Sequence, residues 1–298
     1  MPEKVLRGRA DAAFRAGRVA LIGRPNVGKS TLLNVATGEK IAIVSQHPQT
    51  TRQRLLGVLT DDHTQIAFVD TPGLHVPRHR LGVRMQNEAL EALRDADVTV
   101  FVEDARTKPD PGLLEKLPPR TLCALNKVDL VRPKSNLLPV LETWGAAHAF
   151  DAIVPISAKT GSGVERLLEE IRERLPVGDA LFADDTLTDK PTRFLVAEIV
   201  REQILVRTRQ EVPHGIAVTI DRFDEDPKRG DRIALTIHVP KDSHKKIVVG
   251  RGGAMLKAVG IAARRKIEHL VGHHVHLTLW VRVTPDWVDD PQALGELV

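Results

Sequence analysis

A glycine-rich segment that ends in lysine and serine is the first place where residue types and spacing indicate chemistry. Residues 23–30 read Gly-Arg-Pro-Asn-Val-Gly-Lys-Ser and lie between a short apolar run and a stretch with helical spacing. This is the G-x-x-x-x-G-K-S/T pattern, in which backbone N–H groups wrap phosphates, the lysine reaches the β- and γ-phosphates and the serine hydroxyl binds Mg²⁺. We therefore predict a nucleoside triphosphate site with contacts from Gly23, Arg24, Pro25, Asn26, Val27, Gly28, Lys29, Ser30 and Thr31.

Two later motifs predict which base this site accepts. Asn126, Lys127, Val128 and Asp129 follow one apolar run, and Ser157, Ala158 and Lys159 follow the next. The Asp129 carboxylate can accept hydrogen bonds from guanine N1–H and N2–H₂, which adenine cannot donate, and polar pockets of this kind discriminate by roughly 10⁴-fold. The Ala158 backbone N–H is expected to face guanine O6. GTP and GDP are therefore the predicted ligands, bound through Asn126, Lys127, Asp129, Ser157, Ala158 and Lys159.

A carboxylate at the end of the apolar run that stops at Val69 predicts the metal site. Asp70, Thr71, Pro72 and Gly73 follow that run directly. Asp70 can hold Mg²⁺ through water, while the Gly73 N–H can meet the γ-phosphate and move away when that phosphate is lost. We therefore predict a metal-binding residue at Asp70 and a switch at Gly73.

The polar segment at residues 49–52 reads Gln-Thr-Thr-Arg and predicts a second switch. A threonine in this segment can coordinate Mg²⁺ while GTP is bound, and we favour Thr51 over Thr50. The predicted metal ligands are therefore Ser30, Thr51 and Asp70.

The residue after Gly73 bears on hydrolysis. Many related GTPases carry a glutamine there that orients the attacking water, whereas this chain has Leu74, which cannot do so. We hypothesise that the Asn26 carbonyl helps to hold a potassium ion against the phosphates; the alternative is that Asn26 is a plain turn residue. The predicted catalytic residues are Lys29, Ser30, Thr51, Asp70, Gly73 and Asn26.

A different chemistry is indicated by residues 250–253, which read Gly-Arg-Gly-Gly between two helical segments. In a G-x-x-G loop the glycines let a nucleic-acid backbone come close, and a neighbouring apolar groove receives bases. Residues 241–282 carry nine Lys and Arg against two acidic side chains, which favours a polyanion partner over a solvated charged face. We predict RNA binding by Lys245, Ile247, Val248, Val249, Gly250, Arg251, Gly252, Gly253 and Lys257.

The elements between these motifs must position them. From residue 18 to residue 175, short apolar runs alternate with longer helix-compatible segments, which indicates a mainly parallel sheet covered by helices. The predicted strands are 19–22, 65–69, 98–102, 121–125 and 153–155, and the predicted helices are 29–37, 81–94, 137–144 and 163–175.

A segment without periodicity at residues 177–189 is interpreted as a linker to a second module. That module is expected to contain a helix at 192–208, strands at 217–220 and 233–239, two short helices around 250–253 and a strand at 276–283. The order αββααβ is that of a type II KH domain. The predicted fold class is an α/β P-loop GTPase domain with a mainly parallel sheet (18–176), followed by an α+β type II KH domain (190–285) and a tail (286–298).

The composition of the chain restricts its number of domains, its cysteine chemistry and its location. The chain has 298 residues, 42% hydrophobic and 28% charged, which suits two folded domains. Its single cysteine, Cys123, excludes an intramolecular disulfide and a four-thiolate metal site, and this points to the cytosol. Residues 1–18 lack the apolar core of a secretory signal, and no apolar run is long enough to span a bilayer.

The aromatic content of the chain and three histidines near its C-terminus bear on RNA and metal binding. Aromatic residues make up 3% of the chain with no tyrosine, which argues against RNA recognition by extensive stacking. His273, His274 and His276 invite a metal hypothesis, but no cysteine or paired carboxylate accompanies them, so we favour solvated or RNA-facing histidines.

Taken together, these motifs resemble the Era family of GTPases over nearly the whole chain. Residues 194–202 and 211–213 are similar to the helix that enters that family's KH domain, and residues 287–290 are similar to its tail. Arg251 stands where the family often has lysine, which keeps the charge, and the ending at Val298 alters the last family residues.

The resemblance implies a partner and a location. It implies a cytoplasmic bacterial protein that binds the 3′ region of 16S ribosomal RNA in the small subunit and assists 30S maturation, with weak peripheral contact at the inner face of the cell membrane. We expect a monomer. Two alternatives stay open: a nucleotide-gated RNA-binding module in which GTP turnover is incidental, and a GTP-dependent tRNA-modifying enzyme. The second would need a catalytic cysteine, which Cys123 in a buried-looking strand disfavours.

Overall fold

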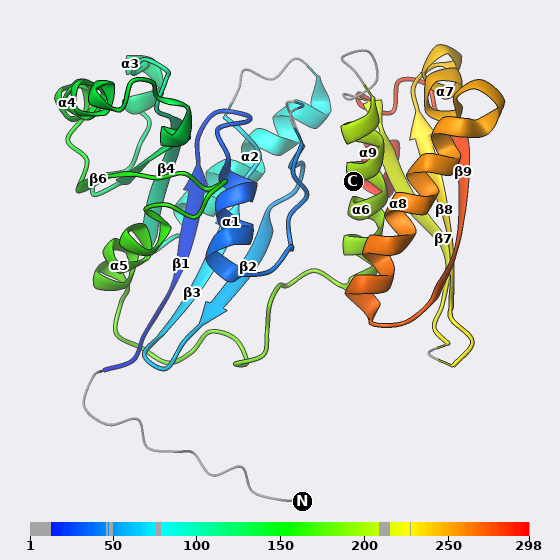
Figure 1. The fold of residues 1–298 in the computed structure, drawn as a ribbon, viewed down its shortest axis with the longest axis horizontal. Helices are drawn as coiled ribbons and strands as arrows, with labels where there is room; N and C mark the ends of the chain where they lie inside the picture. The colour runs from blue at the N-terminus through cyan, green and yellow to red at the C-terminus, as the bar shows by residue number, and fades with distance from the viewer. Residues whose placement is uncertain are drawn as a thin grey trace, which may run out of the picture.

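The structure is a computed structural model that describes residues 13–45, 47, 50–74, 79–208, 215–226 and 228–297. The predicted switch residue Gln49 and residues 211–213 lie outside these ranges. The chain forms two domains that lie side by side, with the N-terminal domain on the left of Figure 1 and the C-terminal domain on the right. No helix of the described part is long and apolar enough to cross a membrane.

The N-terminal domain is built on a six-stranded sheet in the order β2-β3-β1-β4-β5-β6. The strands are β1 (Arg15–Ile22), β2 (Leu55–Thr60), β3 (Thr64–Asp70), β4 (Val98–Asp104), β5 (Leu122–Asn126) and β6 (Ala152–Pro155). All neighbouring pairs are parallel except β2 and β3, which are antiparallel. Strands β3, β4 and β5 are buried along their whole length, which explains their continuous apolar runs.

Helices cover both faces of this sheet. They are α1 (Lys29–Thr37), α2 (Arg80–Arg94), α3 (Pro111–Leu114), α4 (Leu137–Ala147) and α5 (Val164–Arg174), with short 3₁₀ turns η1 (Val128–Leu130) and η2 (Lys134–Asn136). One apolar core joins α1 and α5 to the sheet, and a second joins the α4 side through Trp144 and Phe101. Two cores on opposite faces of one parallel sheet are the layered arrangement that the alternating pattern predicted.

The C-terminal domain contains a three-stranded sheet in the order β7-β8-β9. Its elements are α6 (Thr192–Arg207), β7 (Ala217–Asp224), β8 (Asp231–Val239), α7 (Asp242–Val249), the 3₁₀ turn η4 (Arg251–Gly253), α8 (Ala254–Val271) and β9 (Val275–Val283). Strands β7 and β8 are antiparallel, whereas β8 and β9 are parallel. The predicted fold class, a P-loop GTPase domain followed by a KH domain, is confirmed.

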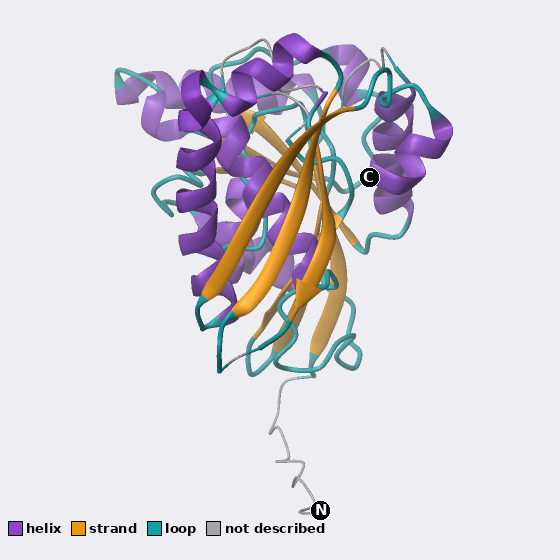
Figure 2. Ribbon diagram, turned by 90° about the vertical axis from the view of Figure 1, so that its right-hand side faces the viewer, coloured by secondary structure: helices purple, strands orange, loops and turns teal. Residues whose placement is uncertain are grey.

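Only one face of this small sheet is covered. Helices α6 and α8 pack on the face that is turned toward the N-terminal domain (Figure 1). Figure 2 views the opposite face, and no described helix lies across the three strands there. β9 is also an edge strand, so its outer face and its edge are both open.

The structure differs from the predicted elements in three places. The pattern missed β2, α3 and a last helix, α9 (Pro291–Leu297). The helix after residue 253 was expected to be short, but α8 has 18 residues. Residues beyond β9 are not a loose tail, because Trp287 and Leu294 pack with Leu81 and Met85 of α2.

Candidate functional site

The phosphate loop lies between β1 and α1, as the motif requires. The Lys29 ammonium is buried and donates hydrogen bonds to the carbonyls of Gly23 (3.1 Å) and Arg24 (3.0 Å). Burial lowers the pKa of Lys29 to about 8, against the opposing effect of Asp70. Phosphate oxygens would favour the charged form of this side chain, which suits a phosphate-binding role.

Gly28 is required at the start of α1. Its φ is 106°, a left-handed value, and a Cβ there would lie 2.2 Å from Asn126 Nδ2. That amide donates to the Val27 carbonyl at 2.7 Å and so ties the predicted base motif to the phosphate loop. Any larger residue at position 28 would separate the two motifs.

Three predicted metal ligands meet at the end of β3. Ser30 Oγ donates to Asp70 Oδ2 at 2.6 Å, and Thr51 Oγ1 lies 3.0 Å from Ser30 Oγ and 3.2 Å from the same carboxylate oxygen. Asp70 is fully buried, burial raises its pKa, and Oδ1 has no hydrogen-bond partner in the described part. An orphaned buried carboxylate oxygen beside two hydroxyls is the all-oxygen donor set that Mg²⁺ prefers.

The structure separates the two candidate threonines. The hydroxyl of Thr50 donates to the His47 carbonyl at 2.6 Å and lies 2.7 Å from Ser45 Oγ, away from the metal site. The hydroxyl of Thr51 is directed to Ser30 and Asp70. This geometry favours Thr51, the residue that the sequence favoured.

The predicted base motifs lie next to each other. Ser157 Oγ donates to Asp129 Oδ1 at 2.7 Å, which orients the carboxylate that is expected to read guanine. The Ala158 N–H donates to Asn126 Oδ1 at 2.9 Å. It was expected to face guanine O6, and here it joins the two base motifs instead.

Lys127 forms a salt bridge with Asp104, which the sequence did not predict. Its ammonium donates to the Asn26 carbonyl at 2.6 Å and lies 3.1 Å from Asp104 Oδ2. Burial alone would raise the pKa of Asp104, but hydrogen bonds from Arg106 and Lys127 lower it to about 2. The only sequence signal for Asp104 is an acidic residue at the end of an apolar strand.

Two other residues of the phosphate loop have clear local roles. Arg24 Nε donates to the buried Glu103 at 2.7 Å and its guanidinium also donates to the Lys108 carbonyl at 3.3 Å. Asn26 has a φ of 62°, a left-handed value that asparagine tolerates better than most residues. The turn role of Asn26 is therefore a structural fact, and it is compatible with the predicted potassium contact, which is that of the side-chain carbonyl and not of the backbone carbonyl bound by Lys127.

The segment between α1 and β2, residues 38–54, contains Thr51 and is called the switch segment below; some of its described residues contact the KH domain. Glu202 of α6 is 2% exposed, and it accepts hydrogen bonds from Lys40 Nζ at 2.8 Å and from the Val44 N–H at 3.2 Å. Lys266 of α8 donates to the same carboxylate at 2.7 Å. These donors hold the pKa of Glu202 below its usual value against burial, which acts in the opposite direction.

Two arginines continue this attachment to the residues around Thr51. Arg201 of α6 donates to the Thr50 carbonyl and pairs with Glu198. Arg52 donates to the Ile216 carbonyl at 2.5 Å. The residues on both sides of Thr51 are therefore bound to the KH domain, Thr50 through its main chain and Arg52 through its side chain.

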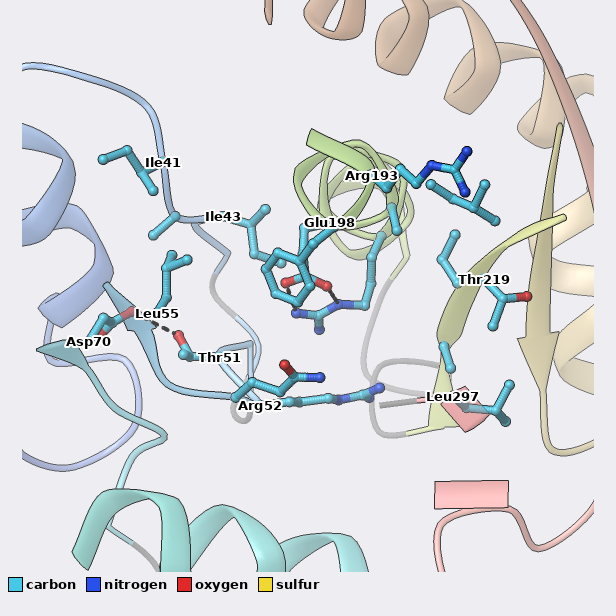
Figure 3. A pocket seen from close by; sticks show the side chains of 18 of the residues that line it. Ile41, Ile43, Thr51, Arg52, Leu55, Asp70, Arg193, Glu198, Thr219 and Leu297 are labelled. Atoms are coloured by element: carbon cyan, nitrogen blue, oxygen red, sulfur yellow. Dashed lines mark hydrogen bonds and ion pairs between the residues drawn. The ribbon is translucent and has the colours of Figure 1, made fainter. Parts of the chain in front are cut away.

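Behind this attachment lies a cavity of about 360 Å³ between the domains. In Figure 3, Thr51 and Asp70 lie on its N-terminal-domain side, whereas Glu198, Thr219 and Leu297 lie on the other side. Residues of the metal site and of the KH domain thus line the same cavity. The sequence placed Arg201 and Glu202 in a helix but gave no sign of their partners.

The predicted RNA-binding loop is exposed. Gly252 has a φ of 58°, and a Cβ there would meet no atom within 4 Å. Lys245, Ile247, Arg251 and Lys257 are also exposed. The predicted contact by Val248 needs correction, because its side chain is fully buried in the KH core and cannot reach RNA.

A groove of about 680 Å³ begins at this loop and runs between α8 and β9. The sequence did not predict most of its lining residues, because they come from two elements that only the fold brings together. They are Gly253, Leu256, Lys257, Gly260, Ile261, Arg264, His276, Leu277, Thr278 and Leu279. Lysine and arginine beside leucine and isoleucine provide both phosphate and base contacts.

The three histidines are held by carboxylates and carbonyls. His273 lies 2.8 Å from Asp231, His274 lies 2.7 Å from Glu268, and His276 lies 3.3 Å from the Arg229 carbonyl. Within the described ranges, no group of three or more His, Cys, Asp or Glu could hold a metal ion.

Comparison with known proteins gives matches to both halves of the chain. Residues 18–127 match the family described as 50S ribosome-binding GTPase, and residues 211–288 match the KH domain family. A protein named GTPase Era from Trichlorobacter lovleyi is 44% identical over 292 residues, which are 97% of this chain and 99% of that protein. GTPase Era from Geobacter metallireducens is 46% identical over 97% of this chain and 99% of its own length.

Solved structures give the same result. A crystal structure of Era in complex with MgGDPNP and nucleotides 1506–1542 of 16S ribosomal RNA superposes with a TM-score of 0.92 at 38% identity, covering 95% of this chain and 98% of that one. Aquifex aeolicus Era bound to GDP and AlF₄⁻ also gives a TM-score of 0.92 at 38% identity, covering 95% of this chain and 99% of its own.

Proposed function

The chain belongs to the Era family of GTPases, and from this premise we propose that it hydrolyses GTP and binds the 3′ region of 16S ribosomal RNA to assist maturation of the small subunit. We also propose that the protein is a cytoplasmic monomer and that it makes weak peripheral contact with the membrane. The observation that carries it is the placement of Thr51 between the metal site and the KH domain. Ser30 and Asp70 lie on one side of Thr51, and Arg201 binds its neighbour from the other.

This chain's own residues bind and orient the nucleotide. Lys29 would neutralise the β- and γ-phosphates, and Asp129, oriented by Ser157, would read the guanine edge. Ser30, Thr51 and Asp70 would hold Mg²⁺, which supplies charge neutralisation on the phosphates when it is bound. The Leu74 N–H donates to the Gly23 carbonyl at 3.0 Å, so the loop after β3 is fixed to the phosphate loop. Because Leu74 offers no polar side chain, the charge that develops on the phosphates must be stabilised by other groups.

A potassium ion held partly by the side-chain carbonyl of Asn26 is the group that we propose for this role; the backbone carbonyl of Asn26 already accepts from Lys127. Potassium is large and loses its water easily, so several oxygens can collect around it. Replacing potassium by sodium at equal ionic strength should slow hydrolysis severalfold with little change in GTP affinity. Asn26→Gly is the variant of choice, because glycine keeps the positive φ and removes only the side chain. It should hydrolyse GTP at the sodium rate in either salt; equal wild-type rates in both salts would return Asn26 to a turn residue alone.

RNA binding is tested at Gly252, where the structure offers a matched pair of variants. Asp and Asn have nearly the same shape, both tolerate a left-handed φ, and the site has room for either side chain. Gly252→Asp adds a negative charge where the RNA backbone should lie, so it should weaken binding of a 16S 3′-end oligonucleotide far more than Gly252→Asn does. GTP affinity should be unchanged in both. Equal RNA affinity of the two variants would contradict binding at this loop.

The alternative function, a nucleotide-gated RNA-binding module in which GTP turnover is incidental, is tested by measuring GTPase rates. If the protein acts through turnover, small ribosomal subunits should change its multiple-turnover GTPase rate. Rates that are equal with and without subunits would favour the gated binding module.

A further inference from the structure

The open face of the KH sheet is a surface that the proposed function leaves unused. Side chains from its three strands form four rows across this face, since the register pairs them directly. The rows are Asp224, Arg232 and His276; Arg222, Ala234 and Thr278; Thr219, Thr236 and Trp280; and Ala217, His238 and Arg282. Figure 2 shows that the β8 and β9 part of this face is turned to solvent, away from the N-terminal domain, whereas on β7 Ala217 is buried against α2 and Trp287.

Trp280 stands out on this face. Its side chain is 64% exposed, and it makes no hydrogen bond, ring contact or cation–π contact within the described ranges. On one side of it lie Thr236, Thr278 and Ala234, which are too small to cover an indole. On the other side lie Arg282 and His238, and the two ring nitrogens of His238 contact Thr219 and Thr284. A tryptophan with this exposed fraction is unusual, because the large apolar surface of this side chain is usually buried. An aromatic ring on a flat sheet surface is the arrangement with which several RNA-binding domains stack bases.

The charges around Trp280 are those of an anion-binding surface. Arg282 and Arg232 lie on the same face and make no ion pair within the described ranges. Of the two acidic residues, Asp224 pairs with Arg222, whereas Asp221 accepts a hydrogen bond from Thr236 Oγ1 at 2.7 Å and keeps its negative charge, so two arginines stand against one carboxylate that has no ion pair. The unpaired charge of this face is therefore positive, which complements phosphates.

This face is continuous with the groove that starts at the G-x-x-G loop. His276 and Thr278 line that groove, although their side chains belong to the exposed side of β9. Thr278 and Trp280 are two residues apart on the strand, which is roughly 7 Å at about 3.3 Å per residue. Because β9 is the edge strand, a nucleic-acid strand that leaves the groove can cross the edge and reach the indole without meeting another element.

We propose that single-stranded RNA bound in the KH groove continues over the edge of β9 and stacks a base on Trp280, with Arg282 contacting a phosphate beside it. This inference rests on the proposed RNA binding and adds to it a second contact area on the opposite side of β9. One stacking residue agrees with the low aromatic content of the chain, which excludes extensive stacking but not a single platform. The site also predicts a footprint longer than the roughly four nucleotides that a KH groove clamps.

The three tryptophans make the test direct. Trp144 and Trp287 are 1% and 0% exposed, so Trp280 is the indole that bound RNA can reach. Intrinsic fluorescence is titrated with 16S 3′-end oligonucleotides of about four and about ten nucleotides, while anisotropy of end-labelled RNA measures affinity. The longer RNA should quench the fluorescence in proportion to binding. The shorter RNA should bind without quenching.

Variants at position 280 separate stacking from folding. Trp280→Ala should lower the affinity for the longer RNA at least about fivefold, since a stacked base contributes at least that factor. It should leave the affinity for the shorter RNA unchanged. Trp280→Phe keeps a ring and should restore most of the affinity. Arg282→Ala should reduce the salt dependence of binding of the longer RNA.

The outcomes distinguish this inference from the function on which it rests. If the longer RNA binds the wild type tightly without quenching, and Trp280→Ala binds it equally well, the stacking site is wrong while RNA binding stands. That result would make Trp280 a candidate protein-contact residue, since exposed tryptophans also anchor protein interfaces. If neither RNA binds the wild type, the proposed function itself fails.

Discussion

At the residue scale, three of the predicted nucleotide contacts are held in place by a partner elsewhere in the chain. Ser157 orients Asp129, Asn126 bridges to the phosphate loop, and Asp104 anchors Lys127. Motif spacing predicts Ser157, Asp129 and Asn126 because the ligand fixes their types. The partners Asp104 of Lys127 and Glu103 of Arg24 depend on which strand ends meet in space, so they could not be predicted from spacing.

Asp129 provides the sharpest residue-scale prediction. Asp129→Asn replaces an acceptor with a donor amide, so it should weaken GTP binding by at least about a hundredfold, within the roughly 10⁴-fold range of polar-pocket discrimination. It should strengthen binding of xanthosine triphosphate, whose ring offers a carbonyl where guanine has an amine. Equilibrium titration measures both, with the exposed Asp62→Asn as a control for loss of charge. Unchanged GTP affinity in Asp129→Asn would refute the base assignment.

At the element scale, α6 links the KH core to the switch segment. Val196, Val200 and Ile204 are buried in the KH core, whereas Arg201 and Glu202 contact the segment that contains Thr51. Apolar periodicity predicted the helix. It could not predict the contacts of Arg201 and Glu202, because charged residues on a helix are usually solvated.

Other elements were likewise predicted where a local sequence signal exists and missed where it does not. The helix from Lys29 to Thr37 was predicted with its observed bounds, because Gly28 and Gly38 end it at left-handed backbone positions. Strand β2 was missed because it is an antiparallel edge strand with a mixed burial pattern. Helix α9 was missed because its packing partner, α2, is about two hundred residues away in the chain, which no local pattern reports.

The α6 contact predicts an effect on nucleotide selectivity. Arg201→Met removes the donor to the Thr50 carbonyl while keeping a long side chain, so Thr51 should be held less firmly at the metal site. Affinity for GDPNP with Mg²⁺ should fall severalfold, whereas affinity for GDP should change little. Limited trypsin digestion should cut the switch segment faster in the GDPNP state.

Arg193→Met is the matched control for this experiment. Arg193 lies on the same helix and lines the same cavity, but it donates to the Phe223 carbonyl within the KH domain. The control should leave GDPNP affinity and trypsin cleavage as in the wild type. If the two variants behave alike, Arg201 supports only the KH fold and the link through α6 is wrong.

At the scale of the whole molecule, the contacts between the domains connect two binding sites. The switch segment has hydrogen bonds to the metal site at Thr51 and to α6 and α8 through Glu202. A ligand that stabilises one arrangement of this segment therefore also favours the arrangement of the KH domain that is bound to it. Thermodynamic linkage requires the effect to be equal in both directions.

The most direct test of this coupling is a complete binding cycle. The affinity of the wild-type protein for a 16S 3′-end oligonucleotide is measured with GDPNP and with GDP, both with Mg²⁺, and the affinities for the two nucleotides are measured with and without that RNA. The preference for RNA in one nucleotide state should be at least about fivefold, the lower end of typical coupling. The RNA-induced change in the ratio of nucleotide affinities should have the same size. RNA affinity that is identical with GDPNP and GDP would contradict the coupling of the GTP site to the KH domain.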